Sequence, residues 1–254
     1  MTPWEMLAVV AAGVGAGAAN AVVGNGTLIT FPVLLTLGIP PITATVSNAL
    51  GLIPGSVSAA VGYRAALAGQ RRRVLRFCAA AIPGGLAGAT LLLVLPAEAF
   101  ERIVPVLVGL ALVLVACQPL ISRAMQRRRP EAAAGRRGDG PPLIAGLALT
   151  SVYGGYFAAS QGTLYLALMS AFLGEPLHRL NAIKNVLVGV VNMAAALVFL
   201  FVARYDWTVV LLIAAGSALG GQIGARLGGL LRPAALRTLI VAVGVLGLFE
   251  LLRH

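Results

Sequence analysis

Two polar interruptions in otherwise apolar sequence contain the residues best suited to bind a small ligand. They are Val23-Gly24-Asn25-Gly26-Thr27 and Ala159-Ser160-Gln161-Gly162-Thr163. Irregular backbone at membrane depth is tolerated only where it is buried in protein or lines a watery cavity. Each interruption precedes a short apolar segment, whose first N–H groups form the positive end of a helix dipole and attract anions. The pattern predicts an anion site formed by Asn25, Gly26, Thr27, Ser160, Gln161, Gly162 and Thr163. The alternative is a pair of glycine hinges or packing notches.

A second polar group lies on the segment from 180 to 203. Asn181, Lys184, Asn185 and Asn192 fall within an arc of about 100° on one helical face. Polar groups on an apolar helix are costly in lipid, so this face must point into protein or a cavity. We expect Lys184, the single lysine of the chain, to supply charge and the amides to donate hydrogen bonds to an anion. The alternatives are a lysine that snorkels to the interface and asparagines that join helices.

The first half contains a related residue, Asn48, on the apolar segment from 43 to 63. Asn48 matches Asn185 at an offset of 137, which fits a one-residue loop insertion. We therefore add Asn48 to the predicted site.

Acidic residues are absent from the middle of every apolar segment. All eight lie at segment ends or in loops: Glu5, Glu98, Glu101, Glu131, Asp139, Glu175, Asp206 and Glu250. This distribution leaves no carboxylate for a proton relay or a sodium cage, so a cation pump is disfavoured and an anionic substrate fits better. Neither paired carboxylates nor a Ser/His/Asp set nor metal ligands indicate an enzyme, and we expect no cofactor and no metal.

The composition requires elements that cross a membrane. Of 254 residues, 59% are hydrophobic and 11% are charged, and the mean hydropathy is +0.94. Apolar stretches of 17 to 25 residues recur along the chain, as a hydrocarbon core about 30 Å thick demands. The net charge of +11 comes from arginines bunched in loops, which orient the chain and touch anionic lipid. We expect a multi-pass all-α protein that contacts lipid and no nucleic acid; the sequence is also compatible with a homo-oligomer.

The sequence repeats itself at an offset of 136. Gly26-Thr27-Leu28 recurs at 162 to 164, Leu37-Gly38-x-Pro40 at 173 to 176, and Gly84-Gly85-x-x-Gly88-Ala89 at 220 to 225. We therefore expect two homologous transmembrane repeats, 1 to 122 and 143 to 254, joined by a flexible Arg-rich cytoplasmic linker from 123 to 142.

Arginine positions predict that the repeats are inverted. The Arg-rich stretches 64 to 76, 123 to 137 and 226 to 237 share the cytoplasmic side if each short segment returns to the side it entered from. Each half then crosses the membrane an odd number of times. The predicted fold is a helical bundle of two inverted repeats with discontinuous or re-entrant helices, an architecture typical of secondary transporters with a site at the midplane.

Five features together resemble the TauE/SafE sulfite exporter family. They are the broken glycine-containing segments, the Leu-Gly-x-Pro loops that follow them, and the stretches "NAIKN", "DW" and "GGQIGARL". The resemblance covers the chain apart from the linker. It implies transport of small sulfur-containing anions such as sulfite, sulfonates or sulfoacetate across a bacterial inner membrane.

The leading hypothesis is a secondary transporter, an exporter of such anions by alternating access. Two alternatives remain open at this point. One is an anion channel of the same fold, and the other is a membrane scaffold that transports nothing.

Overall fold

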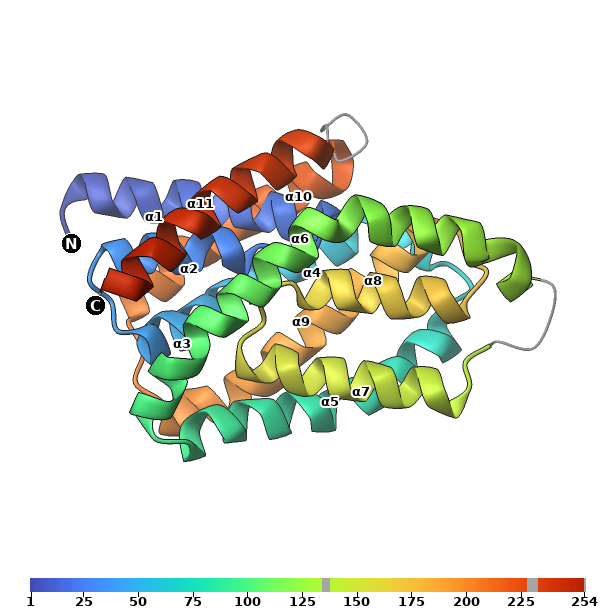
Figure 1. The fold of residues 1–254 in the computed structure, drawn as a ribbon, viewed down its shortest axis with the longest axis horizontal. Coiled ribbons are helices and arrows are strands. Elements are labelled where there is room, and N and C mark those ends of the chain that lie inside the picture. Colours follow the sequence, from blue (N-terminus) through green and yellow to red (C-terminus); the bar gives the residue numbers. More distant parts are fainter. Residues whose placement is uncertain (134–137, 228–232, 254) are drawn as a thin grey trace.

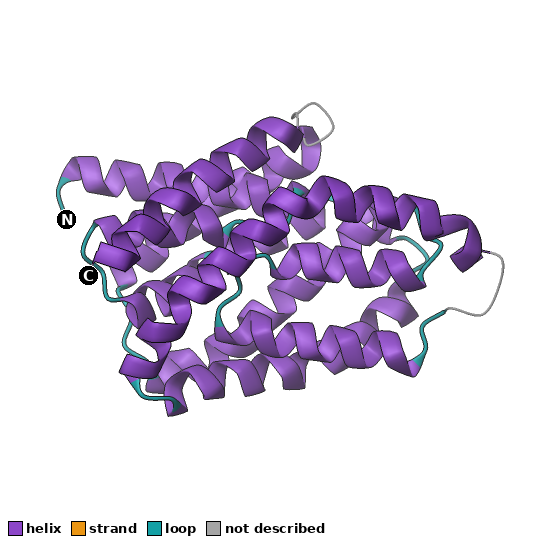
Figure 2. Cartoon of the chain, viewed as in Figure 1, coloured by secondary structure: helices purple, strands orange, loops and turns teal. Residues whose placement is uncertain are grey.

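The structure is a computed structural model that describes residues 1–133, 138–227 and 233–253. In these residues the chain forms only helices and loops (Figure 2). The elements in order are α1 (Pro3–Val22), α2 (Thr27–Thr36), α3 (Pro41–Gly51), α4 (Ile53–Gly62), the 3₁₀ helix η1 (Arg64–Leu67), α5 (Arg71–Val94), α6 (Ala97–Ala133), α7 (Pro141–Tyr156), α8 (Gln161–Phe172), α9 (Leu177–Val202), α10 (Trp207–Leu227) and α11 (Pro233–Arg253). The expectation of an all-α fold is confirmed.

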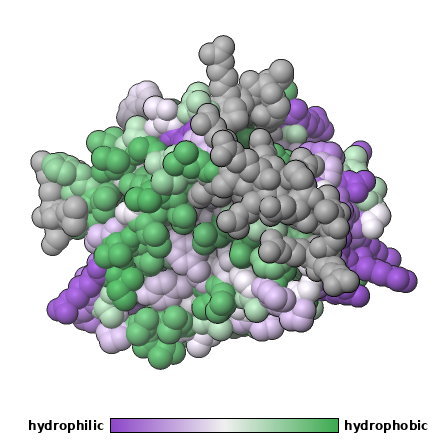
Figure 3. Space-filling view, turned by 45° about the vertical axis from the view of Figure 1, so that its right-hand side comes forward, coloured by the Kyte–Doolittle hydropathy of each residue, from purple (hydrophilic) through white to green (hydrophobic). Residues whose placement is uncertain are grey.

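Six stretches of the described residues are long and apolar enough to cross a membrane. They are Pro3–Val22, Pro41–Gly62, Arg71–Val94, Ala97–Leu120, Leu177–Val202 and Trp207–Leu227. Large apolar side chains are exposed on these helices, among them Phe201 at 85% and Leu211 at 63%. Figure 3 shows hydrophobic residues over much of one face and hydrophilic residues toward its edges. The chain is a multi-pass membrane protein.

The two predicted interruptions separate short helices from longer ones. The chain breaks between α1 and α2 and again between α7 and α8, and α2 and α8 have 10 and 12 residues. In Figure 1 the outer ends of α1 and α2 lie at the left, and those of α7 and α8 lie at the right. Each broken segment therefore leads into the centre of the molecule and back toward the end from which it came.

A charged cluster fixes the outer ends of α7 and α8 together. Arg73, at the start of α5, bonds Asp139 before α7 and Glu175 after α8, each at 2.8 Å. Arg179 adds a bond of 3.3 Å to Glu175. Burial alone would raise the pKa of Glu175, but the hydrogen bonds and charges of the two arginines outweigh it and hold that pKa below its ordinary value.

The two halves of the sequence interleave in space. α10 packs against α1 and α4 of the first half, and α5 packs against α7 and α9 of the second. Glycines permit these close contacts: a Cβ on Gly88 would lie 2.0 Å from the carbonyl oxygen of Val152, and one on Gly220 would lie 2.0 Å from that of Val14. α10 of the second half thus supports the broken segment that begins with α1, and α5 of the first half supports the one that begins with α7.

The structure adds detail to two predicted segments. The stretch from 43 to 63, predicted as one apolar segment, corresponds to the single candidate span Pro41–Gly62, in which α3 and α4 meet at Leu52; Pro54 lacks the N–H that would bond back to α3 at this point. α6 continues to Ala133, so the first part of the predicted flexible linker is helical, and residues 134–137 lie outside the described residues.

Candidate functional site

The two chain breaks touch each other at the centre of the protein. The N–H of Gly162 donates to the carbonyl oxygen of Gly24 at 3.3 Å. The hydroxyl of Thr163 reaches the Asn25 Oδ1 at 3.0 Å and the carbonyl oxygen of Val23 at 3.3 Å. Segments 136 residues apart in sequence therefore share one buried polar centre.

Glycine is required on both sides of this contact. Gly24 has a φ of +91°, which favours glycine, and a Cβ there would lie 2.6 Å from the Cα of Gly162. A Cβ on Gly162 would lie 2.5 Å from the Cα of Gly24. Gly26 meets a different neighbour, because its Cβ would fall 2.5 Å from the carbonyl oxygen of Ala16 in α1. Any larger side chain at Gly24 or Gly162 would push the breaks apart.

A small polar cavity lies beside the contact. The volume in which the centre of a water-sized sphere fits is about 10 Å³, which is enough for a single water molecule. It is lined by Asn20, Gly24, Thr27, Leu52, Ala158, Gln161, Gly162, Val188 and Asn192. The first residues of α2 and α8 are among them, and neither helix has a side-chain cap. Two positive helix ends therefore border one cavity.

Two amides of this lining are incompletely bonded. The Gln161 Oε1 and the Asn192 Oδ1 are buried without a hydrogen-bond partner among the described residues. The Gln161 Nε2 donates to the hydroxyl of Tyr165 at 3.0 Å, which in turn bonds that of Ser151. A buried polar atom without a partner costs free energy, so this cavity is suited to a polar occupant.

Lys184 lies between the breaks and is fully buried. Its ammonium donates to the carbonyl oxygens of Asn20 at 2.7 Å and of Ala21 at 3.2 Å, in the last turn of α1. Its side chain passes Gly162, since a Cβ on that glycine would lie 3.1 Å from the Lys184 Cδ. Carbonyl groups at a helix C-terminus carry partial negative charge, which explains how a buried ammonium is accommodated there. Lys184 takes part in none of the ion pairs among the described residues.

Asn181 and Asn185 lie on the same face of α9 and bond the same helix end. The Nδ2 atoms of Asn181 and Asn185 donate to the carbonyl oxygen of Ala21 at 2.9 and 3.1 Å. The predicted polar face of α9 is therefore real and points into protein. In this structure the hydrogen bonds of Asn181, Lys184 and Asn185 go to the buried carbonyl end of α1.

Other predicted residues occupy the surroundings of the centre. Asn48 donates to Thr27 at 3.2 Å and accepts from Thr30, so it braces the start of α2. Ser160 donates to the carbonyl oxygen of Ala111 in α6 at 3.2 Å and has a φ of 60°. Ser160 therefore holds the second break in place and does not line the cavity.

Three residues of the centre were not among the predicted ligands. Gly24 makes the contact between the breaks. Asn20 lines the cavity, and its Nδ2 lies 3.5 Å from the Ser56 Oγ. The repeat offset contains a signal for Ser56, because α3 and α9 begin 136 residues apart, which pairs Ser56 with Asn192. The same register pairs Asn48 with Lys184 and requires no loop insertion.

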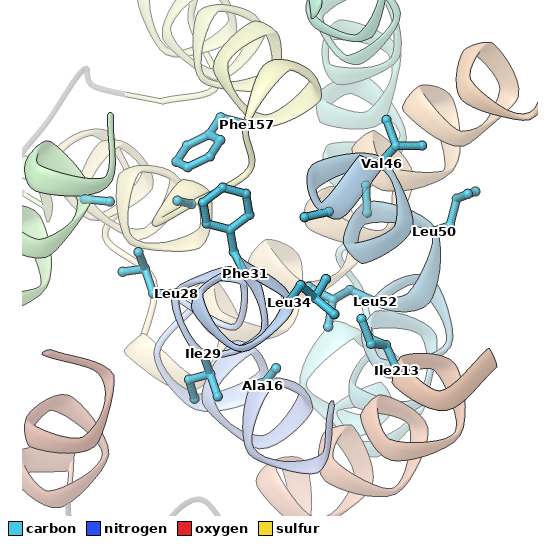
Figure 4. Close-up of a cluster of buried hydrophobic side chains, with 14 of the residues drawn as sticks. Ala16, Leu28, Ile29, Phe31, Leu34, Val46, Leu50, Leu52, Phe157 and Ile213 are labelled. Atoms are coloured by element: carbon cyan, nitrogen blue, oxygen red, sulfur yellow. The ribbon is translucent and has the colours of Figure 1, made fainter. Parts of the chain in front are cut away.

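The second break is surrounded by aromatic side chains. The ring of Phe157 packs edge-on against Phe31, with centroids 5.4 Å apart, and against Phe100 at 6.3 Å. Figure 4 shows Phe157 above Phe31 within a cluster of buried apolar side chains. The hydroxyl of Tyr153 donates to the carbonyl oxygen of Ala159 at 2.6 Å. Among the described residues, no group of three His, Cys, Asp or Glu side chains could hold a metal ion.

Comparisons with known proteins agree with this architecture. The chain is 27% identical over 221 residues to the probable membrane transporter protein YfcA of Escherichia coli K12, covering 84% of this chain and 76% of that protein. It is 27% identical over 214 residues to the probable membrane transporter protein ORF9 of a Sinorhizobium species, covering 83% and 78%. A probable membrane transporter protein of Haemophilus influenzae is 25% identical over 211 residues, covering 82% and 79%.

No solved structure matches the chain significantly. The profile of the family described as sulfite exporter TauE/SafE, whose members are transporters and not enzymes, matches residues 9–251. The resemblance noted in the sequence is confirmed. The chain therefore belongs to the TauE/SafE sulfite exporter family of membrane transporters.

Proposed function

We propose that this protein exports small sulfur-containing anions, such as sulfite or organosulfonates, across a bacterial inner membrane. One observation supports this proposal most strongly: two uncapped helix N-termini border a single polar cavity beside a buried lysine that has no acidic partner among the described residues. Helix N-termini and an ammonium both attract negative charge. A cation would meet repulsion from the same groups.

The proposed ligands come from both breaks and from α9. Lys184 supplies the charge, and the N-terminal turns of α2 and α8 supply oriented N–H groups. Thr27 and Thr163 add hydroxyls, and Gln161 and Asn192 add amides, whose NH2 groups would donate to an anion once the amide turns its nitrogen toward the cavity. Of these residues Thr27, Gln161 and Asn192 line the cavity, while Thr163 and Lys184 lie next to Gly162 of its lining.

Alternating access in this protein would operate on two inverted repeats. The N-terminus would lie outside, and α1 and α2 would re-enter from the outside, while α7 and α8 would re-enter from the cytoplasm. The opposite directions of the two broken segments support this arrangement (Figure 1). Arg64, Arg73 and Arg226 would then lie together on the cytoplasmic side, in agreement with the positive-inside rule.

The small size of the cavity favours a carrier over an open channel. A sulfur oxyanion is larger than the single water that the cavity accommodates. Binding therefore requires the breaks to separate at the contact between Gly24 and Gly162. Separation toward one side and then toward the other would move the anion through the protein.

A transport assay in liposomes tests the proposal. Vesicles that contain the purified protein and internal sulfite should take up labelled sulfite faster than vesicles that contain the protein but no internal sulfite. Uptake should saturate as the external sulfite concentration rises. Flux that neither saturates nor responds to internal anion would indicate a channel.

A thermal-shift screen against sulfite, sulfoacetate, taurine and sulfate tests binding independently of transport. A protein that binds none of these anions and transports none would contradict the proposal and favour a scaffold role.

A further inference from the structure

The carbonyl oxygen of Ala21 has three hydrogen-bond donors, one more than its lone pairs. Lys184, Asn181 and Asn185 all donate to it, at 3.2, 2.9 and 3.1 Å. A carbonyl oxygen has two lone pairs, so one of three donors is redundant. The longest of the three bonds belongs to Lys184.

Lys184 has a second and shorter bond that would survive if it moved. Its ammonium lies 2.7 Å from the carbonyl oxygen of Asn20. Asn20 lines the cavity, and so does Gly162, which the Lys184 side chain passes. Because Lys184 itself does not line the cavity, its ammonium must leave Ala21 to reach it, and the bond to Asn20 is the one that such a movement can keep.

We propose that Lys184 exchanges partners when the anion binds, and that Asn181 and Asn185 are positioning residues that make this exchange possible. In the empty protein the ammonium is shared between the carbonyl oxygens of Asn20 and Ala21. In the loaded protein it leaves Ala21 and donates to the anion. The two asparagines keep the Ala21 carbonyl bonded throughout.

Electrostatics favour the same exchange. The end of α1 carries only partial negative charge, whereas an anion carries a full one. The electrostatic attraction on the ammonium is therefore stronger when it turns toward the anion. An unpaired carbonyl left behind in a buried site would cancel much of this gain. Two amides fixed on the same oxygen remove that cost. This inference rests on the proposed function and reassigns Asn181 and Asn185 from ligands of the anion to ligands of α1.

Replacement of the asparagines distinguishes the two roles. In Asn181→Ala or Asn185→Ala, one amide still bonds Ala21 when the lysine leaves, so the Kd for sulfite should rise less than about threefold. In the double variant nothing replaces the lysine, and the Kd should rise about tenfold or more. The melting temperature of the empty double variant should stay close to that of the native protein, because Lys184 still bonds the carbonyl.

The single lysine of the chain gives a direct probe of the exchange. Protein made with lysine that carries ¹³C at the ε-carbon has one NMR signal from that label. Sulfite should shift this signal in the native protein. The double variant should need about tenfold more sulfite for the same shift.

Each outcome of these measurements decides between the proposals. Single variants that weaken binding as strongly as the double variant would identify the asparagines as anion ligands and overturn this inference alone. Sulfite binding with no shift of the lysine signal would also overturn it alone. If none of sulfite, sulfoacetate, taurine or sulfate binds the native protein, the inference falls together with the proposed function.

Discussion

The two chain breaks have the same position in the repeat but different chemistry. The first break ends α1 with carbonyl groups that are bonded by side chains of α9, among them the ammonium of Lys184. The second break ends α7 among aromatic rings, and its carbonyl at Ala159 is bonded by Tyr153 from within the same segment. Asn48, which corresponds to Lys184, bonds Thr27 and Thr30 in its own half.

This difference indicates a division of labour between related segments. The first break is held by polar groups, which we propose exchange partners, whereas the second is held by close packing that allows little change. Among the described residues a charge is present at the first break only, so our proposal places a bound anion nearer the end of α1 than the end of α7. Four substitutions test this comparison, from the largest expected effect to the smallest.

The shared contact should be the least tolerant point. Gly24→Val places a side chain where the backbone of Gly162 lies and forces valine into a positive φ. We expect no folded protein, measured as loss of the monodisperse species after membrane extraction. Gly109→Val is the matched control, because a Cβ there has no atom within 4 Å. Native-like yield and melting of Gly24→Val would contradict the close contact of the breaks.

The packed second break should respond in stability rather than in binding. Phe157→Ala removes a ring that is 1% exposed and packs against Phe31 and Phe100. We expect a loss of about 3 kcal/mol in the free energy of unfolding, with little change in anion affinity. Phe201→Ala, at a site 85% exposed, should cost much less. Equal losses from both variants would argue against a packed second break.

The hydroxyl that joins the two breaks should have an intermediate effect. Thr163→Val removes the donor to Asn25 and to the carbonyl of Val23 while keeping the side chain's shape. We expect a loss of about 1 kcal/mol in stability, measured by denaturant titration. The exposed Thr90, whose hydroxyl bonds within its own helix, supplies the control Thr90→Val. A neutral result at Thr163 would mean that the breaks are not coupled through this side chain.

The charged cluster that ties α7 to α8 should matter least. Because the pKa of Glu175 is lowered in the folded protein, its contribution to stability is present at neutral pH and is lost as pH falls through that lowered pKa, below about 4.5. Glu175→Gln should cost up to about 1 kcal/mol at pH 7 and flatten this acid dependence. The exposed Glu101→Gln is its control. If the stability of Glu175→Gln fell with pH as steeply as that of the native protein, Glu175 would not be the source of the acid dependence.

The sequence predicts the existence of the site better than its bonding. Polar interruptions in apolar sequence located both breaks, and the spacing of polar residues along one helical face located that of α9, because glycines and amides in apolar sequence have few other uses. It could not reveal that Lys184 bonds the carbonyls of Asn20 and Ala21, since every residue has a carbonyl and residue type does not identify which one is exposed. Asn20 was missed because it lies inside the apolar run of α1.

Binding of an anion by Lys184 is the central claim, and one comparison tests it most directly. Lys184→Gln retains a donor for the end of α1 but has no charge, and Arg179→Gln removes a charge from the N-terminal end of the same helix. Equilibrium binding of sulfite and sulfoacetate to the purified proteins should show native affinity for Arg179→Gln. For a folded Lys184→Gln the affinity should fall by about a hundredfold, as expected when one member of a buried charge pair is lost. Undiminished binding by Lys184→Gln would contradict the account.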